Sequence, residues 1–394
     1  MNILLISSLL SNNLLDDIRK ITGQYPAYAV QKFYRVLAAG LCKNKSNVTV
    51  LSNPPAFMSE KRERFLNYQN DSEDGVNYRY VPFLNFSVIR HLCLFIYTFL
   101  YVFGYGFKKR KDKAIVCDIL CYSTCLAALL AAKITGVKIV GLVTDLPWLV
   151  DEEGKVSFKM RIFGAFTKWY IKKYAYYVFL TEQMNEVINK KLKPYIVIEG
   201  FANIEMENVE NLLEKKDSPK TIMYAGFLQE KYGLKMLVEG FMTLKDLDAK
   251  LVIYGTGPYS EELEECTKID SRVEYRGFAA NSVIVEAELK ASVLINPRPT
   301  HEEYTKYSFP SKNMEYMASG TPILTTKLPG MPLEYYPYIY HFEDETTEGY
   351  ARVIKEVLNK QPEELHKKGA DAKAWVMSKK NNVVQSARIL NMLS

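Results

Sequence analysis

The sequence lacks the two glycine-rich signatures that most often mark nucleotide binding in α/β proteins. No G-x-G-x-x-G follows the first strand expected in either half of the chain, and no G-x-x-x-x-G-K-[ST] occurs. The first absence argues against a dinucleotide-dependent dehydrogenase, and the second argues against a P-loop NTPase.

Patterns typical of metal sites are also scarce. Cys117, Cys121 and Cys125 recur every four residues, a spacing that would place them on one face of a helix. No histidine stands beside them at ligand spacing, so we expect buried core cysteines in a reducing cytoplasm. A D-x-D string, Asp246 to Asp248, precedes a strand at the end away from the expected ligand edge, and we expect no metal there.

The sequence has no long hydrophobic segment of the usual membrane-spanning kind. The apolar start "MNILLISSLL" has no basic region and no cleavage site, so we expect no secretory leader and a cytoplasmic protein. Residues 92–107 are apolar and lead into "KKRKDK", but they fall short of the ~20 residues of a spanning helix. We expect a buried or interfacial helix there.

Charge is unevenly distributed along the chain. Residues 1–200 hold 27 Lys/Arg and 16 Asp/Glu, a net charge of +11, whereas residues 201–394 have a net charge of −5. Residues 155–177 interleave basic residues with Phe, Trp, Ile and Tyr, which is typical of a helix lying on anionic lipid. These features favour peripheral contact with the inner face of the cell membrane. Solvated surface charge, with the apolar helix faces in the core, is the alternative.

The composition is that of a globular protein with two or three domains. Of 394 residues, 48% are hydrophobic and 24% are charged. Strand patterns alternate with helical patterns in both halves, which indicates parallel βαβ units. In the first half we expect strands at 2–7, 47–52, 78–83, 137–147, 176–180 and 194–200, with a polar loop after the first strand and a helix at 29–41. In the second half we expect strands at 221–226, 250–255, 272–277, 292–297 and 321–326.

This alternation predicts an α/β protein with two doubly wound, Rossmann-like domains that face each other across a cleft. The first domain spans 1–201, a polar stretch at 202–219 is the linker, and the second domain spans 220–375. We expect the helical C-terminal stretch, about 376–394, to pack back on the first domain. Ligands of such sheets bind at the carboxyl ends of the strands, so the loops there are the place to look for chemistry.

One of these loops, "SFPSK", stands directly before a helical pattern. Pro310 suits a position at or before the first turn, where open N–H groups and the helix dipole form an anion site. Ser308 and Ser311 add donors, and Lys312 adds positive charge. A pyrophosphate held there would bring Glu315, one turn further on, within reach of ribose hydroxyls. A plain capped helix with a solvated Glu315 is the alternative.

The second half resembles the donor-binding domain of the family-4 retaining glycosyltransferases, which have the GT-B fold. The resemblance rests on "YAGFLQEKYGL", "LVIYGTGP", "VEYRGF" and the run from "VLINPRP" to "TTKLPG", and it extends loosely to "TDLP" and "VFLTEQM" in the first half. It implies a sugar nucleotide as co-substrate, with its diphosphate at the helix N-terminus and its ribose on Glu315. It also implies no cofactor, no metal, and same-face transfer assisted by the leaving phosphate.

The resemblance further implies which residues form the site. The donor would be lined by Gly23, Gly226, Phe227, Gly255, Gly257, Phe278, Ser308, Phe309, Pro310, Ser311 and Glu315. Asp145 would orient the acceptor hydroxyl or a sugar hydroxyl, although a turn-capping role fits it equally well. Lys231 and Lys312 would offset the charge of the leaving diphosphate.

The chain departs from the family pattern at three positions. In the usual Glu-x7-Glu pattern Glu315 fills the second place, but Tyr307 stands at the first and joins the candidate catalytic set. Glu302 or Glu303, in the preceding loop, would be the replacement.

The family also usually has Arg directly after the glycine that corresponds to Gly226, and Lys directly before the glycine that corresponds to Gly233. Phe227 and Tyr232 stand there instead, with Lys231, Arg298 and Lys306 as nearby cations.

These features predict a metal-independent, hexosyltransferase-type glycosyltransferase acting on a glycan or lipid-linked acceptor, as in polysaccharide assembly. The alternative is a catalytically silent nucleotide-sugar-binding subunit that has lost the first glutamate and the basic pair. A nucleic-acid binder is the least favoured reading, because no base-stacking motif accompanies the basic half.

Overall fold

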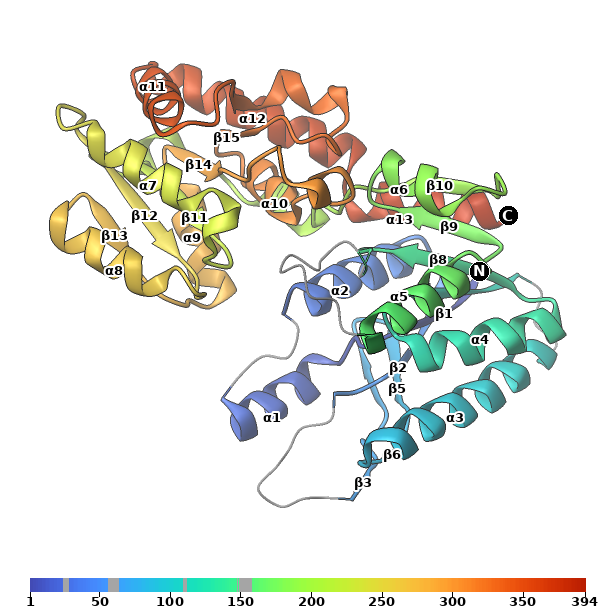
Figure 1. Cartoon of the computed structure of the whole chain (residues 1–394). Helices are drawn as coiled ribbons and strands as arrows, with labels where there is room; N and C mark the ends of the chain where they lie inside the picture. Colours follow the sequence, from blue (N-terminus) through green and yellow to red (C-terminus); the bar gives the residue numbers. More distant parts are fainter. Residues whose placement is uncertain (24–27, 56–63, 109–111, 147, 149–157) are drawn as a thin grey trace. The chain divides into compact units, whose positions relative to one another are not determined.

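The computed structural model (Figure 1) describes the chain except residues 24–27, 56–63, 109–111, 147 and 149–157. The expectations for the loop after Gly23, for part of "KKRKDK", for the end of "TDLP" and for the start of the stretch 155–177 therefore fall partly outside the described residues. The described part divides into two compact units, Met1–Phe201 with Asn382–Ser394, and Ala202–Asn381.

The first unit is built on an eight-stranded sheet in the order β10-β9-β8-β7-β1-β2-β5-β4, parallel except for the β4–β5 pair. The strands of this unit are β1 (Asn2–Ser7), β2 (Asn47–Ser52), β3 (Phe65–Leu66), β4 (Asp71–Glu73), β5 (Val76–Tyr80), β6 (Phe83–Leu84), β7 (Lys113–Asp118), β8 (Lys138–Val143), β9 (Tyr176–Phe179) and β10 (Tyr195–Val197). β3 and β6 form a separate antiparallel pair. The order reverses at β1, which places the topological switch point between β1 and β7.

Helices cover this sheet and bury the apolar strand bodies between them. They are α1 (Asn12–Thr22), α2 (Tyr28–Lys43), α3 (Ser87–Phe107), α4 (Tyr122–Thr135), α5 (Phe158–Ile171), α6 (Glu182–Ile188) and α13 (Asn382–Leu393). The strands are short, and the central ones are buried, apolar runs such as β1 (NILLIS) and β8 (KIVGLV), as expected for a parallel sheet that is covered on both faces.

The second unit is an all-parallel six-stranded sheet in the order β13-β12-β11-β14-β15-β16, with its switch point between β11 and β14. Its strands are β11 (Lys220–Ala225), β12 (Ala249–Tyr254), β13 (Val273–Tyr275), β14 (Val293–Asn296), β15 (Ile323–Thr326) and β16 (Tyr340–Phe342). Its helices are α7 (Leu234–Thr243), α8 (Ser260–Ile269), α9 (Asn281–Lys290), α10 (Ser311–Ser319), α11 (Thr347–Leu358) and α12 (Pro362–Lys379).

Short 3-10 turns complete the second unit. They are η2 (Ile204–Asn208), η3 (Leu213–Lys215), η4 (Glu230–Tyr232), η5 (Glu303–Lys306) and η6 (Leu333–Tyr338). η2 and η3 lie in the stretch 202–219, which the sequence suggested as a linker and which groups with the second unit. The doubly wound, two-sheet α/β architecture expected from the sequence is confirmed.

Two local expectations are wrong. The polar loop expected after β1 contains α1, which begins where the Ser11 hydroxyl accepts a hydrogen bond from the Leu14 N–H. Cys117 lies in β7 and Cys125 in α4, so the cysteines do not share one helix face, although Cys117, Cys121 and Cys125 are all buried.

The helical C-terminal stretch comprises two helices, α12 and α13. α12 belongs to the second unit and α13 to the first, where Asn382 donates a side-chain hydrogen bond to the Val36 carbonyl.

Three loops at the carboxyl edge of the second sheet pack backbone against backbone. Gly233 follows η4 with a φ of 81°, and a Cβ atom there would lie 1.9 Å from the Pro297 carbonyl oxygen. A Cβ atom on Gly255 would lie 1.8 Å from the Gly226 carbonyl oxygen. Any side chain would force these loops apart, so the glycines hold the loop after β11 against the loops after β12 and β14.

We expect Gly233→Ala to destabilise the protein by more than ~4 kcal/mol, because the new methyl group meets backbone in addition to the left-handed strain. Gly136→Ala is the matched control: its φ is 72° and nothing lies within 4 Å of the added Cβ, so only the strain remains. That strain costs roughly 1–2 kcal/mol. Urea unfolding of both variants measures the difference, and equal losses would contradict the packing role of Gly233.

Candidate functional site

The segment "SFPSK" lies at the carboxyl edge of the second sheet, between β14 and α10. Pro310 is the N-cap residue of α10, and no side chain caps the helix. The first backbone N–H groups of the helix, at Ser311 and Lys312, therefore receive no side-chain oxygen. Open amides at a helix start, together with the helix dipole, favour an anion.

Buried donors without partners surround this helix start. Within the described part of the chain, the Ser308 hydroxyl and the side-chain nitrogen of Asn313 are buried and have no hydrogen-bond partner. Asn313 is 1% exposed, and its side-chain oxygen accepts from the Asn296 amide at 2.6 Å. Because buried donors are nearly always paired, these two groups mark a place for a ligand or ordered water. Sequence reasoning missed Asn296 and Asn313, and the only signal was their position at a strand end and in a first helical turn.

Lys312 and Glu315 form an ion pair on the first turns of α10. The Lys312 ammonium lies 3.4 Å from a Glu315 carboxylate oxygen, and both side chains are partly buried. The residue proposed for the diphosphate and the residue proposed for the ribose thus already contact each other. The Glu315 carboxylate therefore offsets part of the charge of Lys312.

A cluster of aromatic and basic side chains lies on the loops after β11 and β14. The Tyr232 and Tyr304 rings lie 6.5 Å apart between centroids, and Phe227 packs edge-on to Tyr232. The Arg298 guanidinium carbon lies 4.6 Å from the Tyr232 centroid, and the Lys231 ammonium 5.9 Å from it. Both cations therefore lie over aromatic faces at the switch point.

The remaining predicted donor residues of the second unit follow strand ends. Gly226 follows β11, Gly255 and Gly257 follow β12, and Phe278 lies beyond β13 with 61% of its surface exposed. The glycines have a packing reason of their own, since each approaches a neighbouring atom closely. The Phe309 ring is 5% exposed and packs against Tyr335, so it belongs to the core and only its backbone can meet a ligand.

The other predicted residues lie on the loop before α10 in the second unit and on two loops of the first unit. Tyr307 ends η5 and is half-buried, and Glu302 lies 3.5 Å from the His301 ring. In the first unit Gly23 ends α1 with a φ of 72° and Asp145 is exposed after β8.

Asp118, at the end of β7 beside the first switch point, is a buried carboxyl that sequence reasoning missed. Its oxygen accepts from the Leu120 N–H at 3.0 Å, and only 2% of the residue is exposed. Burial raises the pKa of Asp118 to about 6, and the charge of Asp145 contributes to the increase. The only sequence signal for Asp118 is its position at the end of an apolar run that forms a strand.

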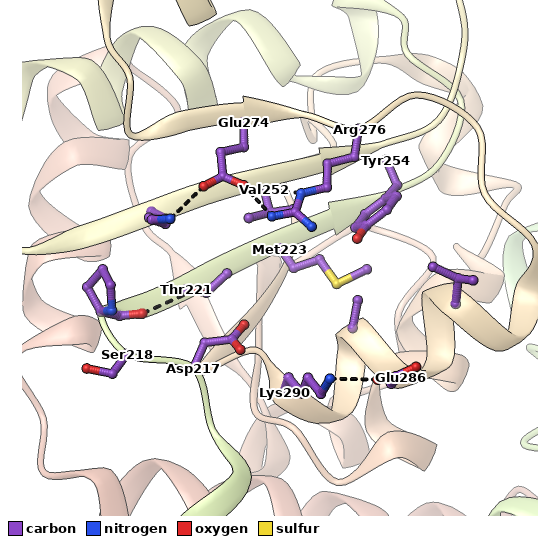
Figure 2. Close-up of a pocket in the computed structure, with 14 residues that line it drawn as sticks. Asp217, Ser218, Thr221, Met223, Val252, Tyr254, Glu274, Arg276, Glu286 and Lys290 are labelled. Atoms are coloured by element: carbon purple, nitrogen blue, oxygen red, sulfur yellow. Dashed lines mark hydrogen bonds and ion pairs between the residues drawn. The ribbon is translucent and has the colours of Figure 1, made fainter.

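No group of three or more His, Cys, Asp or Glu residues within the described ranges could hold a metal ion. A cavity of about 380 Å³ lies between strands β11–β13 and α9 (Figure 2), and none of the predicted site residues lines it. Its charged walls are paired with one another, as in Lys250–Glu274 at 2.7 Å and Lys290–Glu286 at 2.6 Å.

Residues 219–360, which contain these loops, match the family model described as glycosyl transferases group 1. Comparison of the sequence with curated proteins finds no significant match.

The whole chain is similar in structure to solved glycosyltransferases. Sucrose-phosphate synthase from Thermosynechococcus elongatus has a TM-score of 0.69 at 13% identity, over 100% of this chain and 99% of that one. A glycosyltransferase from Rickettsia africae has a TM-score of 0.66 at 14% identity, over 100% and 97%. HepE from Anabaena, in complex with UDP, has a TM-score of 0.62 at 12% identity, over 100% and 99%. The chain therefore has the GT-B fold, and the group 1 match supports nucleotide-sugar glycosyl transfer in general.

The raised pKa of Asp118 predicts a pH-dependent stability. Because the folded state binds this proton more tightly than the unfolded state, stability from this group is greatest at low pH and falls as pH rises from about 4 to about 6. We expect Asp118→Asn to stabilise the protein at pH 8 by about 1–2 kcal/mol more than at pH 5, relative to wild type. Urea unfolding at both pH values tests this, with Asp16→Asn, on the exposed face of α1, as control. A shift that is the same at both pH values would contradict it.

Proposed function

We propose that the protein is a glycosyltransferase that moves a sugar from a nucleotide-diphosphate donor to an acceptor hydroxyl, with the second unit binding the donor. The observation that carries this proposal is the uncapped start of α10 with the unpartnered donors of Ser308 and Asn313 beside it. Together they provide neutral N–H and O–H donors where a diphosphate would lie. The group 1 match over 219–360 and the UDP complex of HepE support the same reading.

In this proposal each loop of the carboxyl edge contacts one part of the donor. The diphosphate meets the N–H groups of Ser311 and Lys312, and Glu315 accepts hydrogen bonds from the ribose hydroxyls. Phe278, exposed after β13, offers a ring on which a base can stack. The glycine loops after β11 and β12 bring backbone close to the same edge.

We propose a retaining, metal-independent reaction. The acceptor oxygen bonds to the anomeric carbon on the face from which the phosphate oxygen departs, and the acceptor proton passes to that oxygen. Basic side chains offset the charge that grows on the leaving diphosphate. Tyr307, in place of the family's first glutamate, leaves a hydroxyl rather than a carboxylate near the sugar, and Asp145 is the first unit's candidate for orienting a hydroxyl.

The exposed face of α3 suggests an acceptor that resides at a membrane. α3 begins at Ser87 and is longer than its apolar sequence run indicated, so its length and composition alone would permit a span. However, α3 lies along α4 (Figure 1), with His91 2.9 Å from Ser123 near one end and Gly106 against Thr135 near the other. A helix packed in this way along a folded unit fits a surface position better than a span.

The outer side of α3 is apolar and its surroundings are basic. Val88, Leu92, Ile96 and Leu100 recur every four residues and are 48–80% exposed. The segments 75–111 and 119–144 contain no Asp or Glu but eight Lys or Arg. An apolar stripe within a basic region fits an anionic lipid surface, and we propose peripheral docking on the cytoplasmic face to reach a lipid-linked glycan.

A catalytically silent nucleotide-sugar-binding subunit is the alternative, favoured by the aromatic residues at 227, 232 and 307. An assay of sugar transfer by the purified chain, with nucleotide sugars as donors and a lipid-linked acceptor, separates the two functions. Sugar transfer supports the enzyme, whereas tight donor binding without transfer or hydrolysis supports the silent subunit.

We expect Glu315→Ala to weaken nucleoside-diphosphate binding about 10- to 100-fold, because two hydrogen bonds from ribose to a charged acceptor are lost. The thermal unfolding midpoint should change by only a few degrees, since the variant loses an ion pair in which Glu315 is 20% and Lys312 33% exposed, and ion pairs open to solvent contribute roughly 1 kcal/mol or less. Titration calorimetry with UDP, ADP and GDP measures the effect, and Glu356→Ala on the exposed side of α11 is the control. Unchanged affinity in Glu315→Ala would remove the ribose assignment.

We expect the double variant Leu92→Ser/Leu100→Ser to lose at least ~10-fold in binding to phosphatidylglycerol-containing vesicles, since two exposed leucines no longer enter the lipid. Leu333→Ser, which removes a 76% exposed leucine from the second unit, should bind as wild type does. Vesicle flotation measures lipid binding of the wild type, the double variant and Leu333→Ser. Equal flotation of the double variant, or no flotation of the wild type, would contradict docking through α3.

A further inference from the structure

Arg298 occupies the carboxyl edge of the second sheet beside the switch point between β11 and β14. It follows β14 and Pro297, and its guanidinium carbon lies 4.6 Å from the Tyr232 ring centroid and 5.7 Å from that of Tyr304. Tyr232 comes from the loop after β11 and Tyr304 from η5. Two separate loops thus hold one cation by their ring faces.

Nothing in the described part of the chain neutralises this cation. Arg298 forms no ion pair there, and its Nε is buried without a hydrogen-bond partner. An unpaired charge with a buried donor is costly, and ring faces offset only part of that cost. Because ring faces accept none of the guanidinium N–H groups, those donors stay available for an anion.

The backbone of Arg298 is fixed from three directions. The Tyr350 hydroxyl donates to the Pro297 carbonyl at 2.7 Å, and the Thr326 hydroxyl donates to the Arg298 carbonyl at 2.5 Å. The Thr300 N–H donates to both oxygens of Glu345, at 2.9 and 3.1 Å. The Gly233 turn packs against the same Pro297 carbonyl oxygen, so the arginine stem leaves a loop that is held by several contacts.

Two lysines lie near Arg298, and they differ in the groups beside them. Lys312 is committed to Glu315 at 3.4 Å, whereas Lys231 shares the platform of Arg298, 5.9 and 5.8 Å from the Tyr232 and Tyr304 centroids. Two positive charges over the same pair of rings repel each other, and a bound dianion would relieve that repulsion. The platform is therefore arranged for a doubly charged group.

We propose that Arg298 is the principal diphosphate-binding side chain of the donor site, that Lys231 is the second cation, and that Tyr232 and Tyr304 position both. This inference rests on the proposed function and deepens it. Positions 227 and 232 of the loop after β11 carry aromatic residues, so the charge at the rings comes from Lys231 in that loop and from Arg298 in the loop after β14. The planar fork of Arg298 can donate two parallel hydrogen bonds to phosphate oxygens as the sugar leaves.

Arg298→Gln and Arg298→Lys test the proposal in the full-length protein, with Arg352→Gln on the exposed face of α11 as the matched control. The probes are UDP, ADP and GDP with their monophosphates, measured by calorimetry over a range of salt concentrations. We expect Arg298→Gln to weaken the bound diphosphate about 10- to 100-fold and its monophosphate much less, and to reduce the salt dependence of diphosphate binding. Arg298→Lys should recover part of the loss.

A pair of Tyr232 variants keeps the test valid if Arg298→Gln folds poorly. Tyr232→Phe retains the ring face and should bind as wild type does, whereas Tyr232→Leu removes it and should weaken diphosphate binding several-fold. If the wild-type protein binds a nucleoside diphosphate and Arg298→Gln binds it with the same affinity, the inference is wrong but the proposed function stands. Equal effects of the two Tyr232 variants would have the same meaning. A wild-type protein that binds no nucleoside diphosphate would overturn the proposed function together with it.

Discussion

The loops at the carboxyl edge of the second sheet are held by direct backbone contact with one another. The loop after β11 touches the loop after β14 where Gly233 meets Pro297, and the loop after β12 touches the loop after β11 where Gly255 meets Gly226. Such contacts leave no room for a Cβ atom and allow little sliding. As a result, side chains from separate loops, such as Tyr232 and Arg298, keep fixed positions relative to one another without a hydrogen bond between them.

The fold could be predicted from sequence wherever strands were short apolar runs bounded by turn residues. β1, β2, β11 and β12 lie within a residue or two of their expected ranges, because parallel strands covered on both faces give continuous apolar runs. α1 was missed because its sequence "NNLLDDIRKIT" is mostly polar and only Leu15 and Ile18 are buried. β7 was missed because the spacing of its cysteine fits a helix, whereas a single spacing cannot distinguish a strand followed by a helix from one continuous helix.

The candidate site could be predicted only in part, for a different reason. Sequence position indicates which residues follow strand ends, and this identified the start of α10 and the exposed Phe278. It does not indicate which charges are already paired. Lys312 is the more obvious cation in the sequence, yet it forms an ion pair with Glu315. Arg298 was only one of several nearby cations in the sequence, and the structure distinguishes it by the tyrosine rings around it. Partners of this kind depend on tertiary contacts between loops that are 60 or more residues apart, as Tyr232 and Arg298 are.

The aromatic residues at 227 and 232 can support either of the two functions considered, an active glycosyltransferase or a silent nucleotide-sugar-binding subunit. Taken alone, they remove two cations from a phosphate site and favour a silent subunit. Taken with Arg298 and Tyr304, they form a set: a tyrosine at 232 provides the face that holds a guanidinium entering from the next loop, and Phe227 packs edge-on against that tyrosine. A lysine at 232 could not serve as that platform and would repel Arg298. In the proposed site the positive charge comes from Arg298 in the loop after β14 together with Lys231 in the loop after β11, so aromatic residues at 227 and 232 do not by themselves imply the loss of transfer.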